Sequence, residues 1–276
     1  MSSHDLVPTP RNLHFDLPAE RICDWYQHCR YMSHWSNSLS IMAPVFERFV
    51  IQAIRAHEST LADVPLLSQQ VKALIDQEAV HAREHRRYNN LIDLAGLPAT
   101  RIARRWQTLL HHTLESRWVS NRMRLAATMM FEHHAAMIAG QELRTRKNTP
   151  DMEPRFLALW NWHALEEIEH KSVSFDLWRH TLAPGPVRYG LRTSTVLLLS
   201  VPFWYMIFES FLRLIWADRH STEHVHGAWR LAKYLWGPHG FFFGNSRGWL
   251  AYFKPGFDPW TDDDVALLKP LEQDRL

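Results

Sequence analysis

The sequence predicts an all-α fold: a bundle of four long helices with one long crossover, followed by an aromatic, partly helical C-terminal extension. Three observations support this prediction. Apolar residues recur at the three- and four-residue spacing of a helix face. Strand-like alternation is rare, and the 276 residues include only 10 glycines against 15 prolines, which argues against sheet folds. With 46% hydrophobic and 22% charged residues, the composition is that of a globular chain.

The individual helices are predicted from this periodicity together with proline, glycine and turn signals. A short helix follows Pro18. The next stretch is expected to be broken, because Pro44 suits the first turn of a new helix. Gly96 and Pro98 end the second long helix, and a turn at 148–151 ends the third. The expected helices span residues 19–31, 44–58, 65–95, 101–111, 114–147 and 153–181. The longest link, between the second and third long helices, is the expected crossover.

The C-terminal part differs from the rest in composition. Residues 195–208 form an almost wholly apolar run, which is shorter than the roughly 20 residues that a membrane span needs. The run is either a helix buried against the bundle or a helix lying on a membrane surface. The aromatic tail after it is expected to be irregular. We therefore divide the chain into an N-terminal segment with a short helix (1–32), the bundle (33–186) and the apolar helix with its tail (187–276).

Charge and cysteine content limit the partners and the compartment. The chain has 31 basic and 29 acidic residues, a net charge of +2, so no strong field attracts nucleic acid. Cys23 and Cys29 are too few for a disulfide framework, and the N-terminus has no apolar leader. We expect a cytoplasmic protein, peripheral to the inner membrane if its apolar helix contacts lipid.

Glutamate and histidine residues at helical spacing are the main indication of function. The pairs Glu78-x-x-His81 and Glu167-x-x-His170 each place a carboxylate and an imidazole on one helix face. One such pair is weak evidence, because a third occurs in the C-terminal part of the chain and about one is expected by chance. The setting is stronger evidence. Both pairs interrupt apolar stripes that face the core, where carboxylates without a compensating cation are costly to bury.

The other two long helices each carry one glutamate in the same setting, Glu47 and Glu132. One glutamate from each of two helices and one E-x-x-H pair from each of the others make the ligand set of a dinuclear carboxylate site. The expected metal ligands are Glu47, Glu78, His81, Glu132, Glu167 and His170. The alternative is a buried salt-bridge network with arginines such as Arg48, Arg83 and Arg124.

This order of ligands resembles that of the ferritin-like di-iron carboxylate proteins, over roughly residues 40–180. The resemblance implies a ferritin-like four-helix bundle that binds two iron ions. The chain also resembles a bacterial family described as predicted metal-dependent hydrolases, whose members carry the same Glu and E-x-x-H elements and an aromatic C-terminal extension. The second resemblance implies a metal-dependent enzyme, although the ligand pattern itself is that of oxygen-activating di-iron proteins.

Two further histidines extend the pattern. His163 precedes Glu167 by four residues on the same face, and the resulting His-x-x-x-Glu-x-x-His arrangement is similar to that of di-iron arylamine N-oxygenases. In those enzymes the added histidine is a seventh protein ligand, which implies that His163 is one here. His85 lies four residues after His81 and is either another ligand or a hydrogen-bond partner of one.

Other polar residues near the motifs are expected to lie outside the site. Glu166 and Glu169 point to the side of their helix and are expected to be solvated or paired with Lys171 and Arg155. His133 and His134 are rotated away from Glu132 by about 100° and 200° and are not expected to bind metal. Small residues beside Glu132 leave room for a substrate pocket with apolar and aromatic walls.

The predicted chemistry follows from the ligands. Carboxylate and imidazole ligation suits iron or manganese, and two iron ions are the stronger prediction in a helical bundle. They indicate an oxygenase or oxidase that uses O₂, an electron donor and a small hydrophobic or aromatic substrate. A dinuclear hydrolase, an iron-binding or ferroxidase protein and a metal-free bundle are the alternatives. Among partners, a homodimer and a membrane surface stay open.

Overall fold

The computed structural model describes residues 5–146, 151–220, 224–238 and 240–261, and within these ranges the chain is all-helical, as predicted. Its α-helices are α1 (Arg30–Arg55), α2 (Pro65–Leu94), α3 (Ala99–His112), α4 (Asn121–Arg146), α5 (Pro154–His170), α6 (Val173–Thr181), α7 (Pro186–Ala217), α8 (His224–Trp236) and α9 (Phe241–Ala251). In the bundle, α1 packs against α2 and α4 packs against α5, while α1 also contacts α4. α3 forms the crossover between α2 and α4.

The break expected at Pro44 does not occur in the first long helix. α1 runs without interruption through this proline. Proline has no N–H to bond the carbonyl one turn earlier, that of Ser40. The side-chain amide of Asn89 in α2 supplies the missing donor, with its Nδ2 3.0 Å from the Ser40 carbonyl oxygen. The helix therefore continues because a neighbouring helix satisfies the group that the proline leaves unpaired.

Three other boundaries also differ from expectation. The helix expected at 19–31 is replaced by a short 3-10 turn at Ala19–Arg21, and α1 begins only at Arg30, after Gln27 and His28 adopt positive φ angles of 54° and 51°. α4 begins at Asn121 rather than at 114. The Ser120 hydroxyl accepts a hydrogen bond from the Met123 N–H and caps the start of the helix. The segment 153–181 is two helices, α5 and α6, and no proline or glycine marks the break between them.

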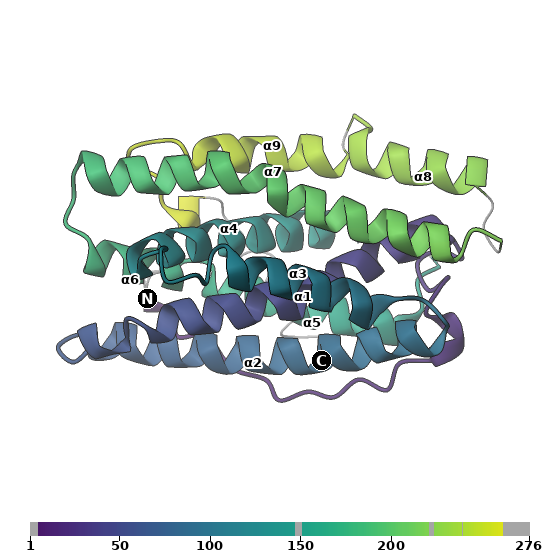
Figure 1. The fold of residues 1–276 in the computed structure, drawn as a ribbon, viewed down its shortest axis with the longest axis horizontal. Helices are drawn as coiled ribbons and strands as arrows, with labels where there is room; N and C mark the ends of the chain where they lie inside the picture. Colours follow the sequence, from purple (N-terminus) through teal and green to yellow (C-terminus); the bar gives the residue numbers. More distant parts are fainter. Residues whose placement is uncertain (1–4, 147–150, 221–223, 239, 262–276) are drawn as a thin grey trace.

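The C-terminal helices form a layer on the bundle (Figure 1). α7 packs against α1 and α4, α8 against α1, and α9 against α4. Part of the aromatic tail that was expected to be irregular is helical, as α9. Within the described residues, α7 has the length and composition of a helix that crosses a membrane, but 39% of its most apolar stretch is buried in the protein.

The buried side of α7 should make this layer part of one cooperative unit with the bundle. Leu214→Ala, at a position that is 0% exposed, should lower the free energy of unfolding by about 2–5 kcal/mol. Leu212→Ala is the matched control, because Leu212 is 61% exposed and its truncation should cost less than about 0.5 kcal/mol. Urea unfolding followed by near- and far-ultraviolet circular dichroism measures both. Two separate transitions, of which only one shifts in Leu214→Ala, would contradict a single unit.

Candidate metal centre

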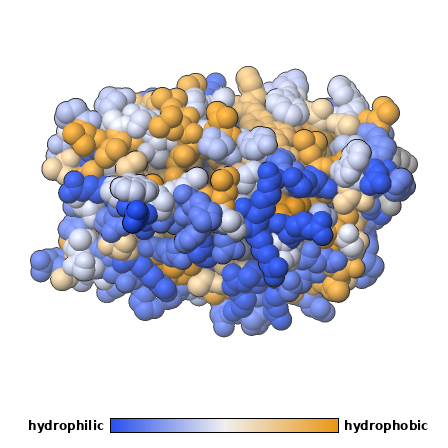
Figure 2. Space-filling model, viewed as in Figure 1, coloured by the Kyte–Doolittle hydropathy of each residue, from blue (hydrophilic) through white to orange (hydrophobic). Residues whose placement is uncertain are grey.

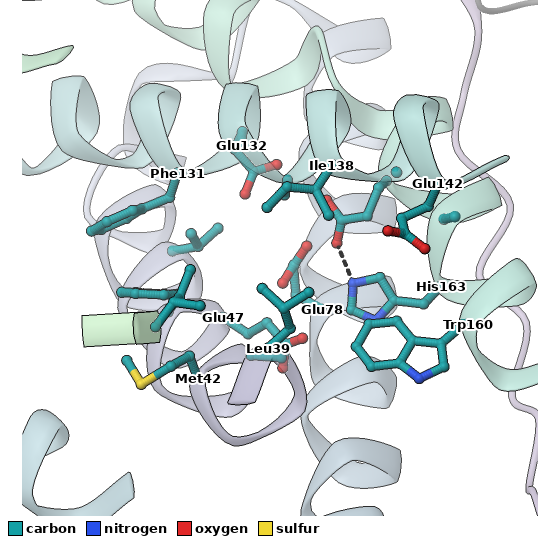
Figure 3. Close-up of a pocket in the computed structure, with 18 of the residues that line it drawn as sticks. Leu39, Met42, Glu47, Glu78, Phe131, Glu132, Ile138, Glu142, Trp160 and His163 are labelled. Atoms are coloured by element: carbon teal, nitrogen blue, oxygen red, sulfur yellow. Dashed lines mark ion pairs between the residues drawn. The ribbon is translucent and has the colours of Figure 1, made fainter. Parts of the chain in front are cut away.

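The seven predicted ligand residues meet in the middle of the bundle. They come from four helices: Glu47 from α1, Glu78 and His81 from α2, Glu132 from α4, and His163, Glu167 and His170 from α5. All are buried except His163, whose side chain is 12% exposed. Figure 3 shows the carboxylates of Glu47, Glu78 and Glu132 converging from their separate helices. The helical periodicity that placed each residue on a core-facing stripe thus brings all seven together.

His170 lies at the centre of the glutamates. Its Nε2 is 3.3 Å from a carboxylate oxygen of each of Glu78, Glu132 and Glu167. On the other side of Glu167, its Oε1 is 2.8 Å from His163 Nε2 and 3.6 Å from His81 Nδ1. Glu47 completes a second group with Glu78 and His81, in which the donor atoms lie within 4.8 Å of one another. These separations suit two cations that share carboxylates.

The proton of His170 is assigned by Gln77. The Gln77 amide nitrogen donates to Glu169 Oε2 at 3.0 Å and to the carbonyl of Thr9 at 3.2 Å. Both partners are acceptors, so the Gln77 oxygen must be the atom that faces His170 Nδ1, 3.0 Å away. Nδ1 therefore carries the hydrogen. In the neutral imidazole, Nε2 then presents its lone pair to the three glutamates.

His81 is oriented by a residue that the sequence analysis placed outside the site. Glu166 is buried, and its Oε2 lies 3.1 Å from His81 Nε2. Its other oxygen accepts hydrogen bonds from Trp162 Nε1 at 2.9 Å and from the backbone N–H of Arg11 at 3.1 Å. Glu166 therefore accepts a hydrogen bond from His81 Nε2, and His81 Nδ1 faces Glu167. The expectation that Glu166 and Glu169 are solvated is wrong, because both are buried. They pair with Arg11 of the N-terminal segment, whereas Arg155, one of the two expected partners, pairs with Glu153.

A chain of three hydrogen bonds orients His163. The Asn89 amide is held by its bond to the Ser40 carbonyl, so its Oδ1 accepts from the Ser40 hydroxyl at 2.9 Å. That hydroxyl must accept from His85 Nδ1, also at 2.9 Å. His85 Nε2 is then an acceptor for His163 Nδ1, 2.6 Å away. His163 Nε2 is left with its lone pair toward Glu167. Donor atoms of His85, His163 and Glu47 lie within 4.8 Å of one another, but both His85 nitrogens already have partners, which favours the positioning role.

The buried charges shift one another's pKa values. Burial raises the pKa of Glu47, Glu78 and Glu132, and neighbouring carboxylates add to the shift. Burial also opposes ionisation of Glu167, but the imidazole of His170 above all holds its pKa well below the usual value. For His81, burial favours the neutral form, yet its bonds to Glu166 and Glu167 raise its pKa to about 9. Without metal, protons must therefore carry the compensating positive charge.

The residues present fit a metal pair better than a salt-bridge network. Among the described residues, neither oxygen of Glu47 accepts a hydrogen bond, and Glu78 Oε1 and Glu132 Oε2 have the His170 imidazole 3.3 Å away but no hydrogen bond. Orphaned buried acceptors are rare without a partner. The arginines of the alternative lie elsewhere: Arg48 pairs with Glu115, Arg83 with Glu84, and Arg124 donates to backbone carbonyls. Four carboxylates would balance the charge of two divalent cations.

An apolar cavity of about 100 Å³ borders the cluster. Five of the seven predicted ligands contribute to its wall, while His81 and His170 do not. Glu142, one of its polar residues, was not predicted, although it lies on α4 four residues after Ile138 and seven after Ala135, which line the same wall. The apolar wall comes from α1, α4, α5 and α7 and includes Leu39, Met42, Phe46, Phe131, Ile138, Ala135, Ala139, Trp160, Phe203 and Ile207.

Fold and site together define a helical-bundle protein with a candidate metal centre of buried carboxylates and imidazoles. The chain belongs to a family described as "predicted metal-dependent hydrolase", whose sequence profile matches residues 9–263. This match supports dependence on a metal and makes an enzyme plausible. Comparison with curated proteins and with solved structures found no significant match.

Metal affinity should depend on the hydrogen-bond chain behind His163. His85→Phe removes the acceptor of the Nδ1 hydrogen, so affinity for Mn²⁺, measured by chelator competition, should fall roughly 10–100-fold. Pulsed electron resonance should also show a changed signal from one imidazole nitrogen. His134→Phe is the control, because His134 is equally buried but bonds the Met130 carbonyl and Ser200. Equal losses in both variants would show a general effect of core disruption.

Metal affinity should also rise with pH. His81 has a raised pKa of about 9, so the metal-free chain keeps a proton on it throughout the neutral range, and a metal must displace that proton. Displacement of this one proton should weaken Mn²⁺ binding by about tenfold for each pH unit below 9. Above pH 9 the affinity should level off. Titration calorimetry in buffers of different ionisation enthalpy should show protons released. Affinity that is constant between pH 6.5 and 8.5, roughly the working range, would contradict this account.

Proposed function

We propose that this protein is a non-haem di-iron oxygenase or oxidase that acts with O₂ on a small hydrophobic or aromatic substrate. One observation carries the proposal: four carboxylates and three imidazoles converge in the core of the bundle, and five of these seven residues line an apolar cavity. The seven proposed ligands are Glu47, Glu78, His81, Glu132, His163, Glu167 and His170.

The donor set supports iron, with manganese as the other metal that it suits. Its atoms are carboxylate oxygens and imidazole nitrogens, and thiolates are absent from it. The negative charge of four glutamates matches two divalent cations, so the loaded centre would be neutral in a low-dielectric core, where an uncompensated charge is costly. When bound, two ferrous ions would supply electrons to O₂.

The cavity supports an apolar substrate. Aliphatic and aromatic side chains make most of its wall, and α7 contributes Phe203 and Ile207 to it. These residues exclude water from the cluster and hold an apolar group beside Glu47, Glu132 and His163. A volume of about 100 Å³ accepts a small molecule or the reacting end of a longer one.

Catalytic turnover also requires a source of electrons. If one oxygen atom of O₂ enters the substrate and the other leaves as water, the reaction consumes two electrons and two protons from outside. An electron donor is therefore a proposed partner. A reaction that adds the oxygen to an arylamine nitrogen is consistent with the added histidine, His163, in the proposed ligand set.

The family description favours a second candidate, a dinuclear hydrolase in which the metals hold a hydroxide. Hydrolysis develops negative charge on a substrate oxygen, and donors beside that oxygen stabilise it. The cavity wall includes no lysine or arginine among the described residues, and Ser36 is its one hydroxyl group. The metals alone would have to perform this task, so we rank the hydrolase second.

The test begins with the metal. The full chain should bind about two Fe²⁺ under anaerobic conditions. Glu132→Gln should bind one or none, because the variant removes one anionic ligand. Glu115→Gln is the control: Glu115 is also largely buried but pairs with Arg48 and His111. Failure of the parent chain to bind any metal would refute the proposal.

The reaction class is tested on the loaded protein. With a reductant and O₂, a panel of arylamines and other small aromatic compounds should give oxygenated products, with ¹⁸O from labelled O₂ in an oxygenase product. Hydrolysis of chromogenic esters without O₂ uptake would establish the hydrolase instead. Oxidation of added Fe²⁺ with no organic product from any substrate would indicate a ferroxidase.

A further inference from the structure

Exposed apolar side chains are concentrated on one layer of the molecule. Of the 19 large hydrophobic residues that are exposed, 13 lie on α7, α8 and α9. These helices contain 32, 13 and 11 residues, a small part of the described chain. In Figure 2 the hydrophobic colour gathers over the side where Figure 1 places this layer, and the side of α2 is mostly hydrophilic. Apolar side chains scattered singly need no explanation, but a concentration on one layer indicates a binding surface.

On each helix these side chains follow a single face. The exposed residues Leu198, Val201, Tyr205, Leu212 and Trp216 of α7 are separated by three, four, seven and four positions, which keeps them on one stripe. The opposite stripe of α7 is buried on the bundle. α7 is thus apolar on both faces. Its outer face is largely exposed, although the Tyr205 ring contacts Trp106 of α3.

α8 and α9 continue this surface and add positive charge. Trp229 and Trp236 are 65% and 60% exposed and lie seven residues apart on α8. Lys233, four residues after Trp229, is also exposed. On α9, Arg247 stands between the exposed Phe243 and Leu250. Each of these two helices therefore presents indole or phenyl rings and a cation on the same face.

We propose that the exposed face of α7, α8 and α9 docks on an anionic lipid surface. The helices α7, α8 and α9 hold six lysines and arginines, of which Arg192 is buried, against one glutamate, whereas the whole chain is nearly balanced at 31 to 29. Anionic headgroups complement this local excess. Exposed indoles are suited to the boundary between headgroups and acyl chains. A second copy of the chain would instead bring the same positive excess against itself.

The geometry assigns docking rather than spanning. Val196, Ile207 and Leu214 of α7 are 0–1% exposed and pack into the protein. The buried guanidinium of Arg192 donates to the carbonyls of Tyr252 and Lys254, which ties the chain after α9 to α7. α7 therefore lies along the bundle as part of its core and can present only its outer face to lipid.

The helix that carries most of this face also borders the cavity on its inner side. Phe203 and Ile207, on the inner side of α7, form part of the cavity wall. A substrate dissolved in the bilayer would therefore approach the metal centre from the docked side. That route rests on the proposed function, but the docking itself does not.

Vesicle binding tests the proposal with the full chain. Sedimentation with vesicles of phosphatidylcholine alone and with roughly 30% phosphatidylglycerol should show at least about tenfold tighter binding to the anionic vesicles, reduced by high salt. Tryptophan fluorescence should be quenched by brominated acyl chains. No binding to either vesicle, or equal binding to both, would overturn the proposal, whatever metal or activity the protein has.

Paired variants locate the surface. Leu198→Ser with Val201→Ser should weaken vesicle binding by about tenfold or more, and Lys233→Glu with Arg247→Glu should abolish the preference for anionic lipid. Leu66→Ser with Leu94→Ser is the control, because both residues are exposed leucines of α2. Circular dichroism and metal content should match the parent in every variant. Equal binding by control and α7 variants would overturn the assignment, as would a dimer in the ultracentrifuge that only the α7 variants dissociate.

Discussion

Four glutamates buried within reach of one another are the constraint on which the rest of the structure depends. Carboxylates in a water-poor core repel each other, and each resists ionisation there. Cations or protons must neutralise them for the bundle to remain closed. Without metal, protons neutralise them. The pKa values of three glutamates are raised, and the carboxylates around His81 and His170 raise the pKa values of these histidines. A pair of metal ions would neutralise the same carboxylates, with the ligand residues already in place.

A second set of polar groups surrounds the first and differs from it in how it is neutralised. Glu166 and Glu169 bind Arg11, and Glu84 binds Arg83. The inner glutamates have none of these arginines. This separation lets the outer carboxylates orient the histidine side chains, while the inner ones remain available to cations. The N-terminal segment takes part because the Thr9 carbonyl and the Arg11 backbone and side chain hold Gln77, Glu166 and Glu169 in position.

The sequence was sufficient to predict the all-helical fold and the convergence of Glu47, Glu132 and the two E-x-x-H pairs, because helical periodicity is local and places such residues on known faces. It was insufficient for Glu166, whose partner Arg11 lies 155 residues away. The break between α5 and α6 carries no proline or glycine signal. The break expected at Pro44 does not occur because the amide of Asn89, in another helix, donates to the Ser40 carbonyl that the proline leaves unpaired. The predictions for Glu166 and Pro44 thus failed because a distant contact overrode a local preference.

Pro44 has a consequence for attempts to engineer this protein. A proline inside a helix costs about 3 kcal/mol relative to alanine, so screens for thermostability would favour its replacement. Any other residue there would carry an N–H that competes with Asn89 for the Ser40 carbonyl. The gain in helix stability would then release Asn89, the first link of the chain that ends at His163. Selection for heat resistance and selection for metal retention therefore act on this one position in opposite directions.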